Sequence, residues 1–268
     1  MNTLLRTLLA LLFLPALPLA AISAPIVRLA SDNWCPYICA ENSRITSGFL
    51  VELTGQILSS AGYQLESRLT PLNRAMKLTE EGEIDGVYAA PIDDRLILSQ
   101  PLAFSRACFY TRRVSTWKYT GLASLKAVPL GVIADYGYDG GAFDAYLQAH
   151  KHDSPSLLDF NRGQAAGETN LGKLLTERYP VALEHEAVMS HLVQGQQSSP
   201  ALIRNAGCLE ERLRLVIGIG KNNPRAPQLI HAIDTGMAKI RASGQLERLM
   251  KKYRINRVPM PGAPATRN

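Results

Sequence analysis

The chain has 268 residues, of which 46% are hydrophobic, and a formal net charge of +6 that is spread along the sequence. This length and apolar content can bury the core of one large domain or of two medium ones. No block of Lys and Arg and no ladder of alternating basic and aromatic residues occurs, which argues against nucleic-acid binding. The mild positive charge suits an anionic small ligand and equally an ordinary basic surface.

Residues 1–23 have the order of regions that is typical of a secretory signal peptide. A single Arg precedes an apolar run that Pro15 and Pro18 interrupt, and small residues follow. A membrane anchor needs about 20 uninterrupted apolar residues, so the prolines argue against one. We expect a cleaved signal peptide, a soluble mature chain that begins near Ala21 or Ala24, and a periplasmic location.

Export decides how the four cysteines, Cys35, Cys39, Cys108 and Cys208, are interpreted. An even number of cysteines in an oxidising compartment favours disulfides, although four cysteines allow three pairings. The pairing Cys35–Cys39 is favoured because Pro36 can turn the chain, and it leaves Cys108 with Cys208. The C-x-x-x-C spacing lacks the second ligand pair of a zinc site and differs from the C-x-x-C redox motif.

Strands and helices alternate over the first part of the mature chain. The hydrophobic pattern predicts a strand, a helix, a strand, a helix and a buried strand over residues 26–30, 47–63, 64–70, 73–84 and 85–91. This β-α-β-α-β order predicts a parallel sheet with helices on its faces.

A second α/β unit follows, and the chain ends in helices. Residues 107–115 and 127–138 predict strands, 140–150 a helix, 171–193 a helix, a strand and a helix, and 212–224 a strand and a turn. Residues 227–254 predict two helices with a break at Ser243 and Gly244.

Four short motifs together resemble the type-3 extracellular solute-binding proteins, the periplasmic receptors of polar amino-acid transporters. The matching positions are Gly48, Phe49, Glu52 and Leu53, then Gly82, Glu83 and Asp85, then Arg95, Ser99 and Pro101, and finally the helix pair over residues 237–253. Leu50 departs from the family, which usually has an acid at that position. The resemblance covers nearly the whole mature chain.

The resemblance implies an α/β fold, the two-lobe clamshell of type II periplasmic binding proteins, in which each lobe is a mostly parallel sheet flanked by helices. Residues 24–110 and 216–258 would form lobe 1, residues 111–215 the inserted lobe 2, and residues 259–268 a flexible tail. The ligand would lie between the lobes, where strand ends and helix N-termini converge.

Two crossing strands, expected at residues 108–113 and 215–221, would form the hinge of the clamshell. The segment SDNWCPYIC follows the first strand and would face the cleft, with Asp32 and Trp34 at family positions that contact ligand. Trp34 offers a ring face to an aromatic group or a cation. In the alternative interpretation, Trp34 and Tyr37 only cover the core of lobe 1.

Arg95 matches the arginine that holds the ligand's α-carboxylate in the family. Its planar guanidinium can donate two parallel hydrogen bonds to a carboxylate. The alternative is a surface arginine that pairs with Asp93 or Asp94. Arg74, at the start of a helix, would either add positive charge to the cleft or be solvated.

The remaining expected ligand contacts come from both lobes and are Leu72, Tyr88, Ala90, Tyr136, Gly137 and His185. Tyr136 and Gly137 precede a predicted helix, whose N-terminal N–H groups could bind an anion. Ala90 replaces the small hydroxyl residue of the family, and His185, flanked by Glu184 and Glu186, replaces the acid that receives the ligand's ammonium. The carboxylate half of an amino-acid site therefore resembles the family, while the ammonium half departs from it.

The resemblance implies a non-catalytic, monomeric binding protein that captures a small carboxylate-bearing solute and presents it to an ABC-type permease. We expect no cofactor and no nucleic acid. We also expect no metal ion, because His185 and His191 stand six positions apart and lack the spacing of a zincin helix. One alternative is an enzyme on the same clamshell, such as a cyclohexadienyl-type dehydratase, with Glu184, His185 or Glu186 as general acid or base. The other is a ligand-sensing partner of a membrane receptor.

Overall fold

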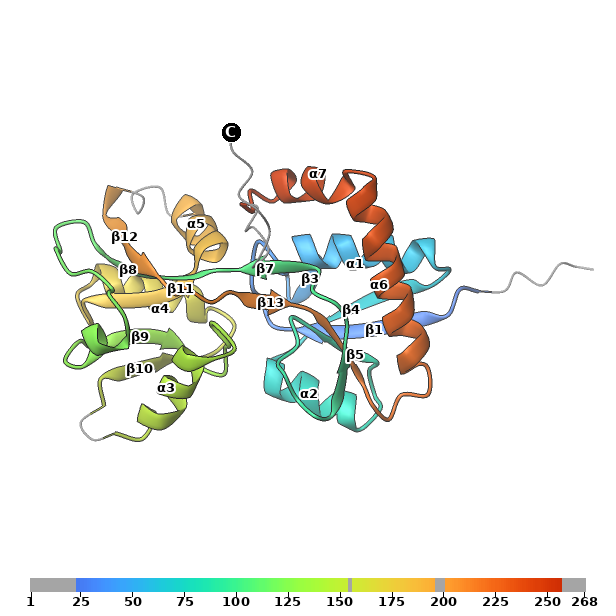
Figure 1. The fold of residues 1–268 in the computed structure, drawn as a ribbon, viewed down its shortest axis with the longest axis horizontal. Helices are drawn as coiled ribbons and strands as arrows, with labels where there is room; N and C mark the ends of the chain where they lie inside the picture. The colour runs from blue at the N-terminus through green and yellow to red at the C-terminus, as the bar shows by residue number, and fades with distance from the viewer. Residues whose placement is uncertain (1–22, 154–155, 196–200, 257–268) are drawn as a thin grey trace, which may run out of the picture.

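The computed structural model describes residues 23–153, 156–195 and 201–256, which form two lobes joined by extended strands (Figure 1). The expected signal peptide, except for its last residue, and the expected tail at 259–268 lie outside the described residues. Within the described part of the chain, every helix is too short or too polar to cross a bilayer.

The sheet of lobe 1 has five strands in the order β4-β1-β5-β14-β6. These strands are β4 (Gln64–Leu69), β1 (Ile26–Ser31), β5 (Gly86–Tyr88), β14 (Ile217–Gly220) and β6 (Leu96–Leu98). β1 pairs in parallel with β4 and β5, as the alternation of strands and helices predicted. β14 follows lobe 2 in the sequence and pairs antiparallel with β5 and β6. The sheet of lobe 1 is therefore built from two separate parts of the chain.

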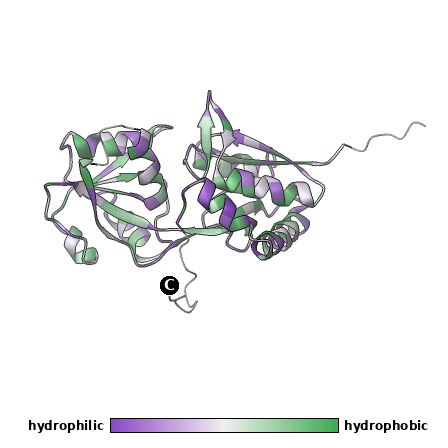
Figure 2. Cartoon of the chain, turned by 90° about the horizontal axis from the view of Figure 1, so that it is seen from above, coloured by the Kyte–Doolittle hydropathy of each residue, from purple (hydrophilic) through white to green (hydrophobic). Residues whose placement is uncertain are grey.

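The helices α1 (Phe49–Ser60), α2 (Leu72–Glu80) and α6 (Ala226–Ala242) pack on this sheet, and α7 (Gln245–Lys252) packs against α1 and α6. α1 and α6 approach closely because Gly236 of α6 faces Ile57 of α1, where a Cβ atom would lie 2.7 Å from Ile57 Cγ2. α6 and α7 meet at the predicted break, where Gly244 adopts a left-handed conformation with φ of 69°. Figure 2 shows hydrophobic residues along most of the strands, while the helices carry both hydrophobic and hydrophilic residues.

The sheet of lobe 2 has the strand order β10-β9-β11-β8-β12. Its elements are β8 (Ala107–Arg112), β9 (Leu130–Ile133), β10 (Leu158–Asn161), β11 (Val181–His185), β12 (Ile203–Cys208), α3 (Ala142–His150), α4 (Ala166–Leu175), α5 (Glu186–Gly195) and a 3-10 turn η1 (Leu122–Leu125). β9, β10 and β11 are parallel, whereas β8 runs antiparallel to β11 and β12. Cys108 and Cys208 stand opposite each other on β8 and β12 and form a disulfide, which was the predicted pairing.

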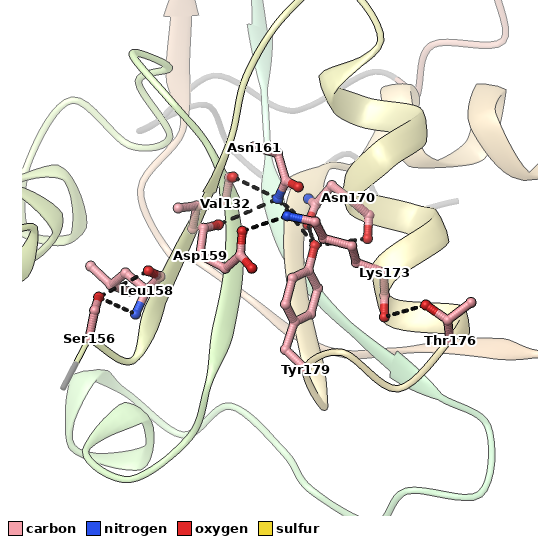
Figure 3. Close-up of polar contacts among 9 residues, drawn as sticks. All are labelled: Val132, Ser156, Leu158, Asp159, Asn161, Asn170, Lys173, Thr176 and Tyr179. Carbon is pink, nitrogen blue, oxygen red and sulfur yellow. Dashed lines mark hydrogen bonds and ion pairs between the residues drawn. The ribbon is translucent and has the colours of Figure 1, made fainter.

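A buried polar network fixes α4 against this sheet (Figure 3). Asn161 Nδ2 donates to Val132 O at 3.1 Å and to the Tyr179 hydroxyl at 3.1 Å, and Asn170 Nδ2 donates to Leu183 O at 3.0 Å. The Tyr179 hydroxyl also donates to Asn170. These bonds satisfy most polar groups of the network, although Asn161 Oδ1 has no partner among the described residues. They hold Asn170 of α4 beside Leu183 of β11.

The crossing between the lobes differs from the predicted hinge. Residues 108–113 lie mostly in β8 and residues 215–221 mostly in β14, and both strands are interior members of their sheets. The crossing is made instead by β7 (Ala103–Ser105) and β13 (Leu213–Leu215), which pair antiparallel with each other and run between the lobes (Figure 1). The predicted segments are apolar because most of their residues are buried inside the two sheets. Their apolar character does not come from connecting the lobes.

Candidate functional site

A cavity of about 630 Å³ lies between the two lobes. Lobe 1 contributes the segment after β1 and the end of α7, whereas lobe 2 contributes Tyr136, the start of α4, the end of β11 and one side of α5. A second cavity, of about 40 Å³, is lined by Asp32, Trp34, Leu72, Tyr88, Tyr136 and Gly137 among others. Trp34 and Tyr136 line both cavities and therefore form the wall between them.

The segment SDNWCPYIC forms a pinned loop at the wall of the large cavity. Cys35 and Cys39 form the predicted disulfide, and both line that cavity. The loop is also closed by backbone hydrogen bonds between Trp34 and Ile38, at 2.8 and 3.0 Å. It then leads into a hairpin of β2 (Cys39–Glu41) and β3 (Arg44–Ser47), which the sequence did not predict.

The same loop also receives the N-terminus of α1. Phe49 N–H donates to Pro36 O and Leu50 N–H donates to Tyr37 O, each at 2.9 Å. Gly48 makes this approach possible, because a Cβ atom there would lie 2.4 Å from Tyr37 O. The first amides of α1 are thus used inside the protein, and they hold Trp34 at the cleft.

Trp34 lines the cleft and is also packed into the core of lobe 1, so it does more than cover the core, and its contact with ligand stays a prediction. Its side chain is 6% exposed, and its ring centroid lies 4.6 Å from that of Tyr37. Across the lobe boundary, its ring meets Tyr136 at 6.0 Å and His185 at 5.0 Å, both edge to face. This aromatic cluster connects the two lobes at the cleft.

A hydrogen-bond chain passes from lobe 1 through the crossing strand β7 into lobe 2. The Tyr37 hydroxyl donates to Ser105 Oγ at 3.0 Å, and Ser105 Oγ lies 2.9 Å from His185 Nδ1. His185 Nε2 lies 3.1 Å from Gly137 O. Because a carbonyl oxygen only accepts, Nε2 carries the hydrogen, and Nδ1 accepts from Ser105. Burial lowers the pKa of His185 to about 4, which keeps the ring neutral.

His185 therefore does not offer a free nitrogen to a ligand. Both ring nitrogens are bonded within the protein, and the side chain is fully buried. The sequence placed His185 where the family has its ammonium-binding acid. Its neighbour on β11, Glu184, lines the large cavity, which His185 does not.

Glu184 is a buried carboxyl group with one free oxygen. Its side chain is 1% exposed, and Oε1 accepts the His185 backbone N–H at 2.8 Å. Oε2 has no hydrogen-bond partner among the described residues. Burial raises the pKa of Glu184 to about 8 against the effect of that hydrogen bond, and the charges of Glu168 and Asp32 add to the rise.

Asp32 is the carboxyl group of the small cavity. It is half-buried and accepts hydrogen bonds from Ser31 and from Tyr136. Burial raises the pKa of Asp32 to about 6, although these hydrogen bonds act in the opposite direction. One carboxyl group thus stands on each side of the wall that Trp34 and Tyr136 form.

Six of the predicted ligand residues, those that line the small cavity, are brought together by the fold. Ala90 and Arg74 line neither cavity. Ala90 is buried in the core of lobe 1, where it packs against Gly218, and Arg74 is exposed on the first turn of α2. Glu184 could have been noticed in the sequence as the acid beside the aligned position, since a one-residue shift on β11 changes which face it occupies.

Arg95 lines neither cavity and is bonded within lobe 1. Its Nε and Nη2 donate to the two carboxylate oxygens of Asp93 at 2.8 Å each, and Nη1 donates to Glu80 at 3.0 Å. These hydrogen bonds lower the pKa of Asp93 to about 2. The geometry is the pairing with Asp93 that the sequence offered as the alternative. A ligand contact through Arg95 stays a prediction that no contact here supports.

Comparison with known proteins places this geometry in a family. A sequence model of the bacterial extracellular solute-binding proteins, family 3, matches residues 27–256. A search of curated protein sequences found no match.

Solved structures give the same fold. A histidine kinase sensor domain with similarity to periplasmic binding proteins has a TM-score of 0.71 and 16% identity, over 86% of this chain and 96% of that one. An ancestral arginine-binding protein bound to arginine has a TM-score of 0.69 and 15% identity, over 86% and 99%.

A third structure is an amino acid ABC transporter substrate-binding protein of Streptococcus pneumoniae bound to L-arginine. It has a TM-score of 0.65 and 14% identity, over 85% of this chain and 94% of that one. The predicted α/β fold, a type II clamshell of two lobes, is confirmed by these likenesses. The chain belongs to the bacterial extracellular solute-binding proteins, family 3.

Proposed function

We propose that this protein is a non-catalytic periplasmic receptor that binds one small solute between its lobes and presents it to an ABC-type permease. The observation that carries the proposal is the cavity of about 630 Å³, whose walls come from both lobes. Two short strands, β7 and β13, connect the lobes beside it. A solute in this cavity contacts both lobes and so favours their closed arrangement, which a permease can distinguish from the open one. The protein acts as a monomer in this scheme.

The charges that line the cavity bear on the class of solute. The family resemblance implies a carboxylate-bearing solute held by Arg95, but that guanidinium is bonded to Asp93 and Glu80. The cavity itself is lined by the acids Glu41, Glu168 and Glu184 and by the bases Lys252 and Arg254. We therefore leave the carboxylate as one outcome of the test and base the proposal on the cavity.

The test combines solute identification with a measurement of lobe closure. The exported protein is denatured, and mass spectrometry identifies the solute that it releases. The solute is then returned to protein refolded without it, and small-angle scattering should show a smaller radius of gyration. A tightly bound solute that leaves the scattering curve unchanged would contradict capture by lobe closure.

Two observations favour other uses of the same cleft. The similarity to a histidine kinase sensor domain favours a sensing role, in which the closed form binds a membrane receptor instead of a permease. Crosslinking of the solute-loaded protein to its own membranes, followed by identification of the partner, separates these two roles. The raised pKa of Glu184 would also suit a general acid. Recovery of a chemically altered solute after incubation would support that enzyme alternative.

A further inference from the structure

We infer that Tyr136 determines which part of the cleft is open to the solute. When the lobes are together, its side chain keeps the space beside Asp32 and Leu72 closed, so that the solute is confined to the large cavity and does not contact Asp32. The inference rests on the proposed function, because it takes the large cavity as the solute site. It departs from the expectation that a ligand binds directly to Asp32, Leu72 and Gly137.

The volume of the small cavity is the first support. Six residues that were expected to contact the ligand surround this cavity, but its volume is only about 40 Å³. Pockets that bind small molecules usually have volumes of about 300–1,000 Å³, a range that includes the large cavity with its volume of about 630 Å³. The small cavity can hold water, whereas an amino acid needs more room than it offers.

The Tyr136 side chain forms part of the wall between the two cavities. Tyr136 and Trp34 line both cavities, and their ring centroids lie 6.0 Å apart, edge to face. The Tyr136 hydroxyl donates a hydrogen bond to Asp32. Tyr136 belongs to lobe 2 and both of its partners belong to lobe 1, so these contacts form only when the lobes come together. Removing the Tyr136 ring would therefore join the small cavity to the large one.

The backbone on both sides of Tyr136 holds the side chain in this position. The preceding residue, Asp135, has a φ of 66°, a left-handed conformation that is uncommon for a residue other than glycine. The carbonyl oxygen of the following residue, Gly137, accepts a hydrogen bond from His185 Nε2 at 3.1 Å. Residues that the surrounding structure holds in such conformations are found mainly at functional sites. These constraints fix the direction in which Tyr136 points, toward lobe 1.

The hydroxyl of Tyr136 also takes the place of a solute group at Asp32. Asp32 accepts hydrogen bonds from Ser31 Oγ at 3.3 Å and from Tyr136. Burial and the charge of Asp32 raise the pKa of Tyr136 well above its usual value, so the hydroxyl keeps its proton and stays a donor at neutral pH. A solute amine at Asp32 would have to break this hydrogen bond. Binding in the large cavity leaves the bond intact and is therefore favoured.

Binding of p-cresol to Tyr136→Ala tests the inference. p-Cresol has the shape and the hydroxyl group of the removed side chain, and toluene lacks only the hydroxyl. In titration calorimetry, p-cresol should bind to Tyr136→Ala about tenfold or more tightly than toluene, because a hydrogen bond to a charged group contributes about 10- to 100-fold in affinity. The wild-type protein should bind neither compound, because its own ring takes up the space.

Two further variants make the test specific to this site. Tyr136→Phe keeps the ring and removes only the hydroxyl, so it should bind neither p-cresol nor toluene. Asp32→Ala, added to Tyr136→Ala, removes the acceptor and should abolish the preference for p-cresol over toluene.

A stability measurement tests the same contact without the Tyr136→Ala variant. Tyr136→Phe removes the donor and should lower the melting temperature by about 2–4 °C while Asp32 is present. In Asp32→Ala the hydroxyl has already lost its acceptor, so the same substitution should leave the melting temperature unchanged or raise it.

Several outcomes would overturn the inference. These are binding of p-cresol by the wild type or by Tyr136→Phe, no binding by a folded Tyr136→Ala, and an effect of Tyr136→Phe that is the same with and without Asp32. If a solute still closed the lobes, the proposed function would stand and only the role of Tyr136 would be wrong. If no solute of any class closed them, the proposed function itself would fail, whichever variant bound p-cresol.

Discussion

Removing the Ser105 hydroxyl should destabilise the protein by breaking the chain that joins the lobes. In Ser105→Ala, the Tyr37 hydroxyl loses its acceptor and His185 Nδ1 loses its donor. Both residues are buried, with Tyr37 2% and His185 0% exposed, so water cannot replace the bonds. Each unsatisfied group costs about 1–3 kcal/mol, which gives a loss of about 2–4 kcal/mol in the free energy of unfolding.

Equilibrium urea denaturation, followed by both fluorescence and circular dichroism, measures this loss. Ser60→Ala is the control, because its hydroxyl caps only Ile57 O at an exposed helix end, and it should cost less than about 0.5 kcal/mol. Tyr37→Phe and the double variant complete a cycle, whose coupling energy should be about 1 kcal/mol or more. Additive effects of the two substitutions would contradict the hydrogen-bond chain through Ser105. A loss of stability in Ser105→Ala no larger than that of the control would contradict it as well.

Two further predictions concern the core of lobe 2 and the titration of the cleft. Gly131→Ala should lower the melting temperature and the free energy of unfolding, the latter by about 1–3 kcal/mol, because its Cβ would lie 2.1 Å from Cζ of Tyr179. Gly172→Ala, in open space on α4, is the control and should not lower the melting temperature. Equal melting temperatures of the two variants would contradict this packing. Because the pKa of Glu184 is raised to about 8 in the folded state, its protonated form stabilises the protein fully below about pH 4.5. That stabilisation is lost as pH rises through 8. In urea denaturation, the free energy of unfolding of the wild type should therefore fall by roughly 2–5 kcal/mol relative to Glu184→Gln between pH 5 and 8, and the titration of His185 cancels in this difference. A difference that does not change with pH would contradict the burial of Glu184.

The sequence predicted the long elements of this fold because they carry a clear period. α1 and α6 repeat their apolar residues at helical spacing, and β8 and β11 begin with the apolar runs ACFY and VAL. Each of these elements is present near its expected position. The break between α6 and α7 was also visible, since Gly244 accepts a left-handed conformation without cost.

The elements that control the cleft are too short to predict from a pattern. β7 and β13 have three residues each, which is less than two periods of a strand. The hinge was consequently assigned to the neighbouring buried strands. The hairpin of β2 and β3 is mostly exposed or half-buried, so it lacks the alternation that would indicate a strand.

The candidate site shows the same limit at the level of single side chains. The aromatic and acidic residues after β1 were found because they follow a strand end, where clefts form. Arg95 was assigned by its motif, but its partner Glu80 lies 15 positions earlier and is brought to it only by the fold. Glu184 gains its role from burial and from the free oxygen, which no sequence pattern expresses.

A crystal structure of the exported protein with the solute that it retains through purification tests the central claim most directly. The account predicts electron density for one small solute in the cavity between Trp34, Glu168 and Glu184, in contact with both lobes. A solute bound outside this cavity, for instance with a carboxylate on Arg95 in place of Asp93, would contradict it.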